Sequence, residues 1–340
     1  MFLERVNVLR VVGMDSRSKE NHRTARRDTR FLYAIQCVLA PALFTLGPSY
    51  SAVQFGFSDA QTMAYAHNEA APILHGAHGL DVNMTWLLRN IQFWRHHFLI
   101  DDGILRPAYE GLDEEDRPQW WDSKLSQNIT TLGRHWRGSY AFVDRNEMND
   151  IRAGRNTEEA IIDQLNGEED PSAAFQSLDL NLADPNATWF PPFEKHLHSL
   201  AIPKSKARSR AQHSGAAGSE QSSVDFAMRA LRFNGGGHDN SENFLADGWL
   251  NPLPPQFGIP GWQRMTMMKF FVDDEGIDMD ALWAYEGILL PGGKIMIGRW
   301  WCPSDGYGAD MYSGPFILWN VERPMQFDDL AATEGGSDDE

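Results

Sequence analysis

The sequence has little cysteine, and this scarcity limits what the protein can be. Its two cysteines, Cys37 and Cys302, lie far apart in the chain. Two cysteines cannot build a disulfide framework, and no cysteine or histidine pair has the spacing of a closed zinc site. Free thiols are typical of reducing compartments. We therefore expect a cytoplasmic or nuclear protein with no metal and no other cofactor.

Positive charge is also scarce, because 30 Lys and Arg stand against 47 Asp and Glu, which gives a formal net charge of −17. Phosphates would be repelled by a surface this acidic, so we expect no nucleic-acid partner. Long apolar runs are nearly absent. Phe31–Leu46 is apolar, but it is short for a membrane span and contains Gln36 and Pro41. It predicts a buried helix and no membrane association.

The chain lacks the common catalytic signatures. The run Gly235–Gly237 has no following Lys-Ser/Thr, so it predicts a turn and not a phosphate loop. No Gly-x-Ser-x-Gly elbow occurs. Glu286 is the best acid candidate, but glycosidase chemistry needs two carboxylates. We therefore expect a protein that is not an enzyme.

Two patterns of secondary structure divide the chain. Val82–Leu99 has apolar residues at helical spacing, whereas from Leu132 onward short apolar and aromatic runs alternate with Gly and Pro turns. This predicts an α+β fold, in which an antiparallel β-barrel or β-sandwich with long loop insertions follows a helical segment. The expected parts are a disordered N-terminus (1–24), a helical segment (25–130), a β domain (131–322) with a disordered insertion at about 203–223, and an acidic disordered tail (323–340).

Aromatic side chains are numerous, with 12 Trp and 19 Phe, and many fall on the predicted strands. If Leu290-Pro-Gly-Gly-Lys294 forms a hairpin turn, Glu286 faces Arg299 on one side of the sheet and Tyr285 shares the other side with Trp300. The charged pair then either offers donors to a ligand or closes the hairpin as a structural ion pair. Candidate residues of a binding pocket are Trp136, Tyr140, Trp283, Tyr285, Glu286, Arg299, Trp300 and Tyr312.

Several motifs carry a family resemblance. They are Trp136-Arg-Gly-Ser-Tyr, Ile259-Pro-Gly-Trp-Gln-Arg, the run from Trp283 to Trp301, and Tyr312-Ser-Gly-Pro-Phe-Ile-Leu-Trp. Over about residues 55–322 the sequence resembles the C-terminal, substrate-binding region of fungal F-box proteins. The resemblance implies a substrate receptor of a cullin-based ubiquitin ligase, in which an F-box binds a Skp-type adaptor.

The F-box itself is degenerate or missing, because residues 1–54 lack its usual Leu-Pro-acidic opening. Only Phe31–Leu46 has suitable apolar content, which makes Leu39 and Leu43 the candidate adaptor contacts. The leading expectation is a protein-binding, substrate-receptor-type subunit without catalysis. The alternative is a small-molecule-binding barrel, or an enzyme of unknown chemistry that uses Glu286 and Arg299.

Overall fold

A computed structural model gives the architecture of the protein. The residues it describes are 22–45, 56–76, 79–99, 105–119, 132–155, 174–183, 190–197, 231–239, 242–274, 276–303 and 311–321. The expected disordered insertion (about 203–223) and the acidic tail (323–340) lie outside these ranges. Most of the expected disordered N-terminus does so too, although the first described helix begins at His22.

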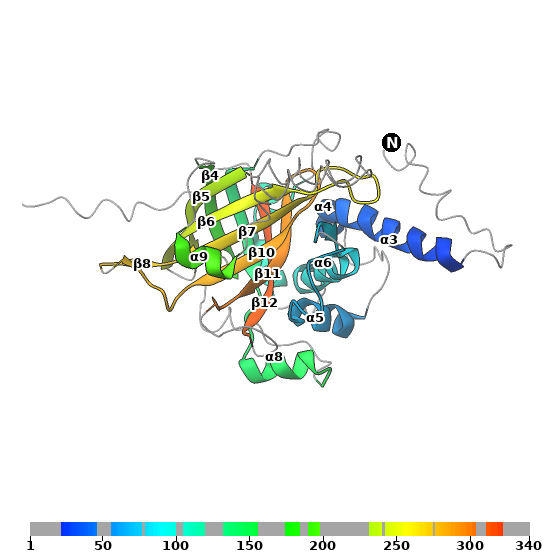
Figure 1. Ribbon diagram of the computed structural model, residues 1–340, viewed down its shortest axis with the longest axis horizontal. Coiled ribbons are helices and arrows are strands. Elements are labelled where there is room, and N and C mark those ends of the chain that lie inside the picture. The colour runs from blue at the N-terminus through cyan, green and yellow to red at the C-terminus, as the bar shows by residue number, and fades with distance from the viewer. Residues whose placement is uncertain are drawn as a thin grey trace, which may run out of the picture.

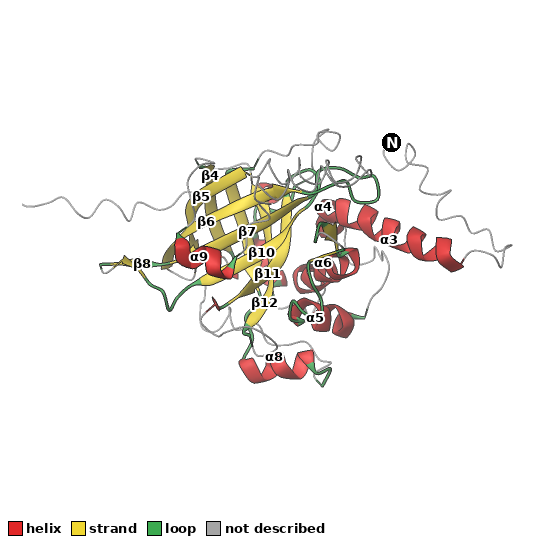
Figure 2. Cartoon of the chain, in the orientation of Figure 1, coloured by secondary structure: helices red, strands yellow, loops and turns green. Residues whose placement is uncertain are grey.

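Eight antiparallel strands close into a barrel, which confirms the α+β prediction and selects the barrel over the sandwich (Figures 1 and 2). Each strand pairs with the next one along the chain, and the last strand returns to the first. The strands are β3 (His135–Tyr140), β4 (Gln176–Leu182), β5 (Leu231–Asp239), β6 (Glu242–Pro252), β7 (Gln263–Phe270), β10 (Trp283–Leu289), β11 (Ile295–Trp301) and β12 (Ser313–Val321). A small hairpin of β8 (Val272–Asp273) and β9 (Gly276–Ile277) lies between β7 and β10.

Glycines make room for large side chains inside the barrel. Gly287 of β10 pairs with Gly298 of β11, and both face the lumen. A Cβ at Gly298 would lie 2.3 Å from the Phe316 ring of β12. An eight-stranded barrel has an interior just wide enough for side chains to fill, so a missing Cβ on one strand accommodates an aromatic ring from its neighbour.

The same principle corrects the prediction that Gly235–Gly237 form a turn, because all three lie inside β5. A Cβ at Gly235 would lie 1.8 Å from the backbone oxygen of Asp179 on β4, and one at Gly237 would lie 2.5 Å from the Phe244 ring. The glycines therefore permit close approach of neighbouring strands. The three glycines are required at these positions, but the reason is close packing between strands and not a turn.

The helical segment is built around α6 (Met84–Leu99), which begins at the Asn83 side chain, an acceptor for the Trp86 N–H at 3.1 Å. Its side chains are buried on nearly every side, because it packs against the other helices and the outer face of the barrel at β11 (Figure 1). Around it lie α3 (His22–Val38), α4 (Ala40–Thr45), α5 (Phe57–Tyr65), α7 (Arg106–Gly111), a short 3₁₀ helix (Glu114–Asp116) and the pair β1 (Leu74–His75) and β2 (Asp81–Val82).

The apolar segment Phe31–Leu46 forms the end of α3 and all of α4, with the break between them at Leu39, two residues before Pro41. Its buried apolar residues join the core around α6, as the sequence predicted for a buried helix; they are Ala34, Cys37, Val38, Ala40 and Phe44. In the described part of the chain, no helix combines the length and the apolarity needed to cross a membrane.

Two further helices contact the barrel directly. α8 (Arg145–Arg152) follows β3 and is capped by the Asp144 side chain, which accepts from two N–H groups of the first turn. α9 (Pro191–His196) lies on the outer face of β7 and β10, where Phe193 packs with Met268 and Phe270. The inner face of the barrel is therefore distinct from its outer face, much of which is covered by helices.

Candidate functional site

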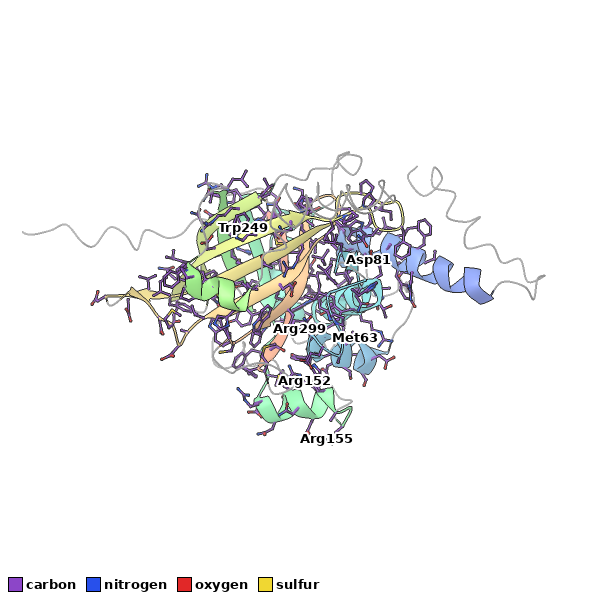
Figure 3. The ribbon with its side chains drawn as sticks, in the orientation of Figure 1. Met63, Asp81, Arg152, Arg155, Trp249 and Arg299 are labelled. Carbon is purple, nitrogen blue, oxygen red and sulfur yellow. The ribbon has the colours of Figure 1, made fainter. Side chains whose placement is uncertain are left out.

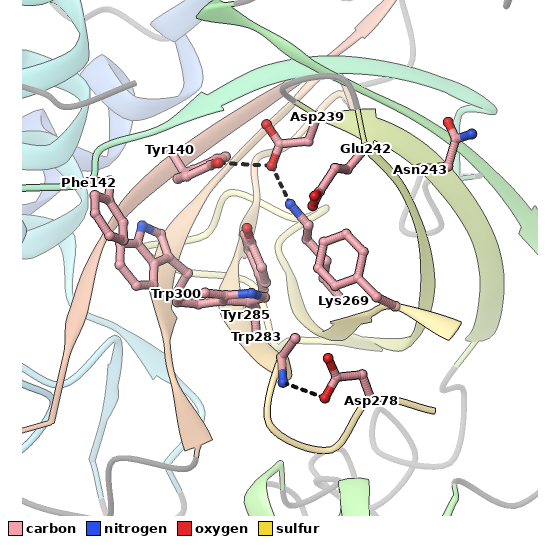
Figure 4. A pocket seen from close by; sticks show the side chains of 12 residues that line it. Tyr140, Phe142, Asp239, Glu242, Asn243, Lys269, Asp278, Trp283, Tyr285 and Trp300 are labelled. Atoms are coloured by element: carbon pink, nitrogen blue, oxygen red, sulfur yellow. Dashed lines mark hydrogen bonds and ion pairs between the residues drawn. The ribbon is translucent and has the colours of Figure 1, made fainter. Parts of the chain in front are cut away.

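The barrel lumen is filled at one end and hollow at the other. At the filled end, Trp136 is fully buried and its indole N–H donates to the Gly133 carbonyl at 2.7 Å. At the other end, the mouth pocket has a volume of about 680 Å³ (Figure 4). Its lining residues are Tyr140, Phe142, Asp239, Glu242, Asn243, Lys269, Phe271, Asp278, Ala281, Trp283, Tyr285 and Trp300.

One wall of the mouth pocket is a packed group of aromatic rings around Trp300. Phe142 stacks on Trp300 with centroids 5.9 Å apart, whereas Trp283 and Tyr140 meet it edge-on at 5.4 and 6.2 Å. These separations are typical of favourable aromatic pairs. Because neighbouring rings hold the indole from several sides, the wall is a rigid apolar surface for a flat ligand.

The floor of the mouth pocket is polar. One carboxylate oxygen of Asp239 accepts from the Tyr140 hydroxyl at 2.8 Å and from the Lys269 ammonium (Figure 4). Lys269 is only 3% exposed, and its nitrogen lies 4.3 Å from the centre of the Phe244 ring. Burial lowers the pKa of Lys269 below its ordinary value, although the charge of Asp239 opposes this shift. The pair therefore resembles other buried ion pairs, which are kept together by the cost of separating them.

Tyr285 stands beside this pair, from the neighbouring strand β10, and is 2% exposed. Burial raises the pKa of its phenol well above the ordinary value, and nearby Tyr140 and Asp239 raise it further. The hydroxyl therefore stays protonated at neutral pH and acts as a neutral hydrogen-bonding group.

Half of the predicted pocket residues meet at the mouth. Tyr140, Trp283, Tyr285 and Trp300 line it. Tyr312 lies next to them, with its ring 5.5 Å from that of Trp300, and its hydroxyl donates to the Val143 carbonyl.

The other predicted residues lie elsewhere. Trp136 closes the filled end of the lumen, whereas Glu286 and Arg299 lie on the outer face. The expectation of one pocket that contains all eight residues is therefore wrong. Because side chains alternate between the two faces of a strand, Glu286 points away from Tyr285 and Arg299 points away from Trp300.

The sequence reasoning missed the polar floor. Asp239 ends a strand whose three glycines predict a turn in the sequence, and Lys269 belongs to the strand Gln263–Phe270. A signal for Lys269 was present, because it has the same strand parity as Met265 and Met267, which face the lumen. A lysine on the apolar face of a strand predicts a buried partner, but only the fold identifies that partner as Asp239.

The predicted opposition of Glu286 and Arg299 is confirmed in the register of β10 and β11. Their direct pairing is wrong, because the Glu286 carboxylate accepts from Arg264 of β7 at 2.6 Å. Strand β10 has β11 on one side and β7 on the other, and Glu286 bonds to the arginine on β7. Hairpin geometry alone gave no information about β7.

Arg299 joins the barrel to the helical segment (Figure 3). It is 1% exposed, donates to the Asn68 side chain and the Ala71 carbonyl at 3.2 Å each, and lies over the Trp86 ring at 5.5 Å. Burial lowers its pKa to about 10, with Glu286 opposing the shift. A second cavity of about 340 Å³ lies at this junction, lined by residues that include Arg264, Glu286 and Arg299.

The candidate adaptor contacts fall at the turn between α3 and α4. Leu39 is half-buried there. Leu43 belongs to α4, but its side chain lies outside the described residues. Both cysteines are free and buried.

Comparisons with known proteins add no relative. No protein-family model matches the chain, and no curated protein or solved structure matches it either. Function must therefore be inferred from the site itself.

We expect Arg299→Ala to lower the free energy of unfolding by about 3 kcal/mol, because hydrogen bonds to charged groups contribute about 1.5–3 kcal/mol and the change empties a buried site. Urea denaturation measures the effect. Arg155→Ala is the control, since that side chain is 65% exposed and pairs only at the surface with Asp150; its effect should stay within about 0.5 kcal/mol. Equal effects for the two variants would contradict a structural role for Arg299.

Proposed function

We propose that the protein binds a small ligand with a flat apolar body in the mouth pocket of its barrel, and that it does not convert this ligand. The observation that supports the proposal is the lumen, which is packed at one end and hollow at the other. Ligand pockets are typically concave, mostly apolar, about 300–1,000 Å³ in volume and equipped with a few placed polar groups. At about 680 Å³ the mouth pocket lies within this range of volumes, and its lining joins an aromatic wall to several polar side chains.

The arrangement of its lining favours a planar ligand. Trp283 and Trp300 present indole rings from adjacent strands, and Phe271 adds a third apolar group. A flat ligand gains contact with rings that already hold one another in place, so little side-chain freedom is lost on binding. Catalysis through Glu286 and Arg299 is not proposed, because neither residue lines the mouth pocket and each is engaged on the outer face.

The neutral fluorophore N-phenyl-1-naphthylamine tests this function. We expect its fluorescence to rise on binding in the mouth pocket, and we expect Trp283→Ala to weaken binding about tenfold, since loss of one aromatic contact costs about 0.5–1.5 kcal/mol. Trp249→Ala is the matched control, because Trp249 has the strand parity of the outer face of β6 and packs beneath Arg232 at 5.7 Å. No binding, or equal loss in the two variants, would contradict the proposal.

As a second candidate, we propose that the chain is a substrate-receptor subunit that resembles the fungal F-box proteins, and that it joins a Skp-type adaptor and a cullin ligase to a protein client. All four resembling segments belong to the barrel or lead directly into it, so the resemblance covers one folded unit. The helical segment is packed against that unit through α6 and β11. Such a connection suits a receptor, which must hold its client at a fixed distance from its adaptor. In this role the mouth pocket takes an aromatic or apolar side chain of the client.

Co-elution with a purified Skp-type adaptor tests the receptor role. We expect the native chain to elute with the adaptor in size-exclusion chromatography and the double variant Leu39→Asp and Leu43→Asp to elute alone, because buried carboxylates are costly in an apolar interface. Retained binding of N-phenyl-1-naphthylamine by the variant would show that the barrel is still folded. If the native chain elutes alone, the receptor role fails for this chain.

A further inference from the structure

The hydroxyl of Tyr285 lies in the mouth pocket without a hydrogen-bond partner among the described residues, whereas its neighbour Tyr140 is bonded to Asp239 (Figure 4). The indole nitrogen of Trp300 has no partner there either, but that atom is fully buried. Tyr285 is only 2% exposed, and it lines the pocket. Its hydroxyl is not among the buried polar atoms that lack a partner, so it is open to the pocket. It can therefore donate to a bound molecule that accepts a hydrogen bond.

The electrostatics of the pocket limit the charge of that molecule. Three carboxylates line it, those of Asp239, Glu242 and Asp278, against the single ammonium of Lys269. An anion is therefore repelled at the mouth. A cation at the floor would meet the Lys269 ammonium, whose own charge is already held by Asp239. A neutral acceptor avoids both costs.

We propose that Tyr285 is a specificity-determining residue, which donates its hydroxyl proton to a carbonyl oxygen at the buried end of an uncharged, flat, apolar ligand. This inference rests on the proposed small-ligand function and adds the chemical class of the ligand, a neutral aromatic ketone, ester or amide. Because the Tyr285 hydroxyl keeps its proton, it can donate at every pH near neutrality.

Three naphthalenes of similar size separate the contributions. 2-Acetylnaphthalene has a neutral carbonyl, 2-ethylnaphthalene has the same body without an acceptor, and 2-naphthoate has a charged acceptor. Their affinities are measured by displacement of N-phenyl-1-naphthylamine. We expect the acetyl compound to bind about tenfold more tightly than the ethyl compound, which corresponds to one satisfied hydrogen bond. We expect naphthoate to bind more weakly than the acetyl compound.

The variant Tyr285→Phe then assigns the preference to one hydroxyl. It should reduce the acetyl-to-ethyl affinity ratio to about one and leave the affinity for 2-ethylnaphthalene within about twofold. Tyr109→Phe is the control, because its hydroxyl bonds to the Phe44 carbonyl in the helical segment; it should keep the native ratio.

The outcomes distinguish the two levels of the proposal. If the acetyl and ethyl compounds bind equally to the native chain, or if Tyr285→Phe keeps the tenfold ratio, the role of Tyr285 is wrong but small-ligand binding stands. If naphthoate binds most tightly, the ligand is anionic and the charge inference is wrong. If no naphthalene binds and N-phenyl-1-naphthylamine does not bind either, both the inference and the proposed function are overturned.

Discussion

Closure of the sheet is the constraint on which the rest of this structure depends. Eight strands with no free edge enclose a lumen whose width is set by strand number. Every second residue must then fit inside. Some large rings fit because a neighbouring strand has no Cβ, as with Phe316 beside Gly298 and Phe244 beside Gly237. Where this filling stops, at the level of Tyr285 and Trp300, the lumen becomes the mouth pocket.

The outer wall of the barrel serves a different purpose. Ile297, Ile317 and Trp319 face outward from β11 and β12 and belong to one core with α6. Arg299 fixes the same contact through polar bonds to the segment after α5. Through this junction the helical segment and the barrel stabilise each other. The barrel wall separates Arg264, Glu286 and Arg299, on its outer face, from the aromatic pocket inside.

Strand-level features of this fold were predictable from the sequence because alternation is a local property. The opposition of Glu286 and Arg299, and the shared face of Tyr285 and Trp300, both follow from one Pro-Gly-Gly turn. Partners contributed by other strands were not predictable in this way. Arg264 pairs with Glu286 across β7 and β10, and Lys269 reaches Asp239 on β5, across β6. Those contacts depend on the order of strands around the barrel, which no short motif encodes.

Glycine shows a further limit of local reasoning. A run of three glycines is most often a turn, and Gly235–Gly237 were interpreted accordingly. In the barrel they are strand residues, and the absence of a Cβ lets the neighbouring strands approach closely. Because the sequence predicts a turn here, it gives no indication of Asp239. This residue follows His238 at the end of the same strand and supplies the carboxylate that bonds to Tyr140 and Lys269.

A crystal structure of the protein with N-phenyl-1-naphthylamine tests the central claim most directly. The account predicts the probe inside the mouth pocket, against Trp283 and Trp300, with Trp136 and the filled end of the lumen unchanged. A probe bound in the second cavity beside Arg264 and Arg299, with the mouth pocket left empty, would contradict it.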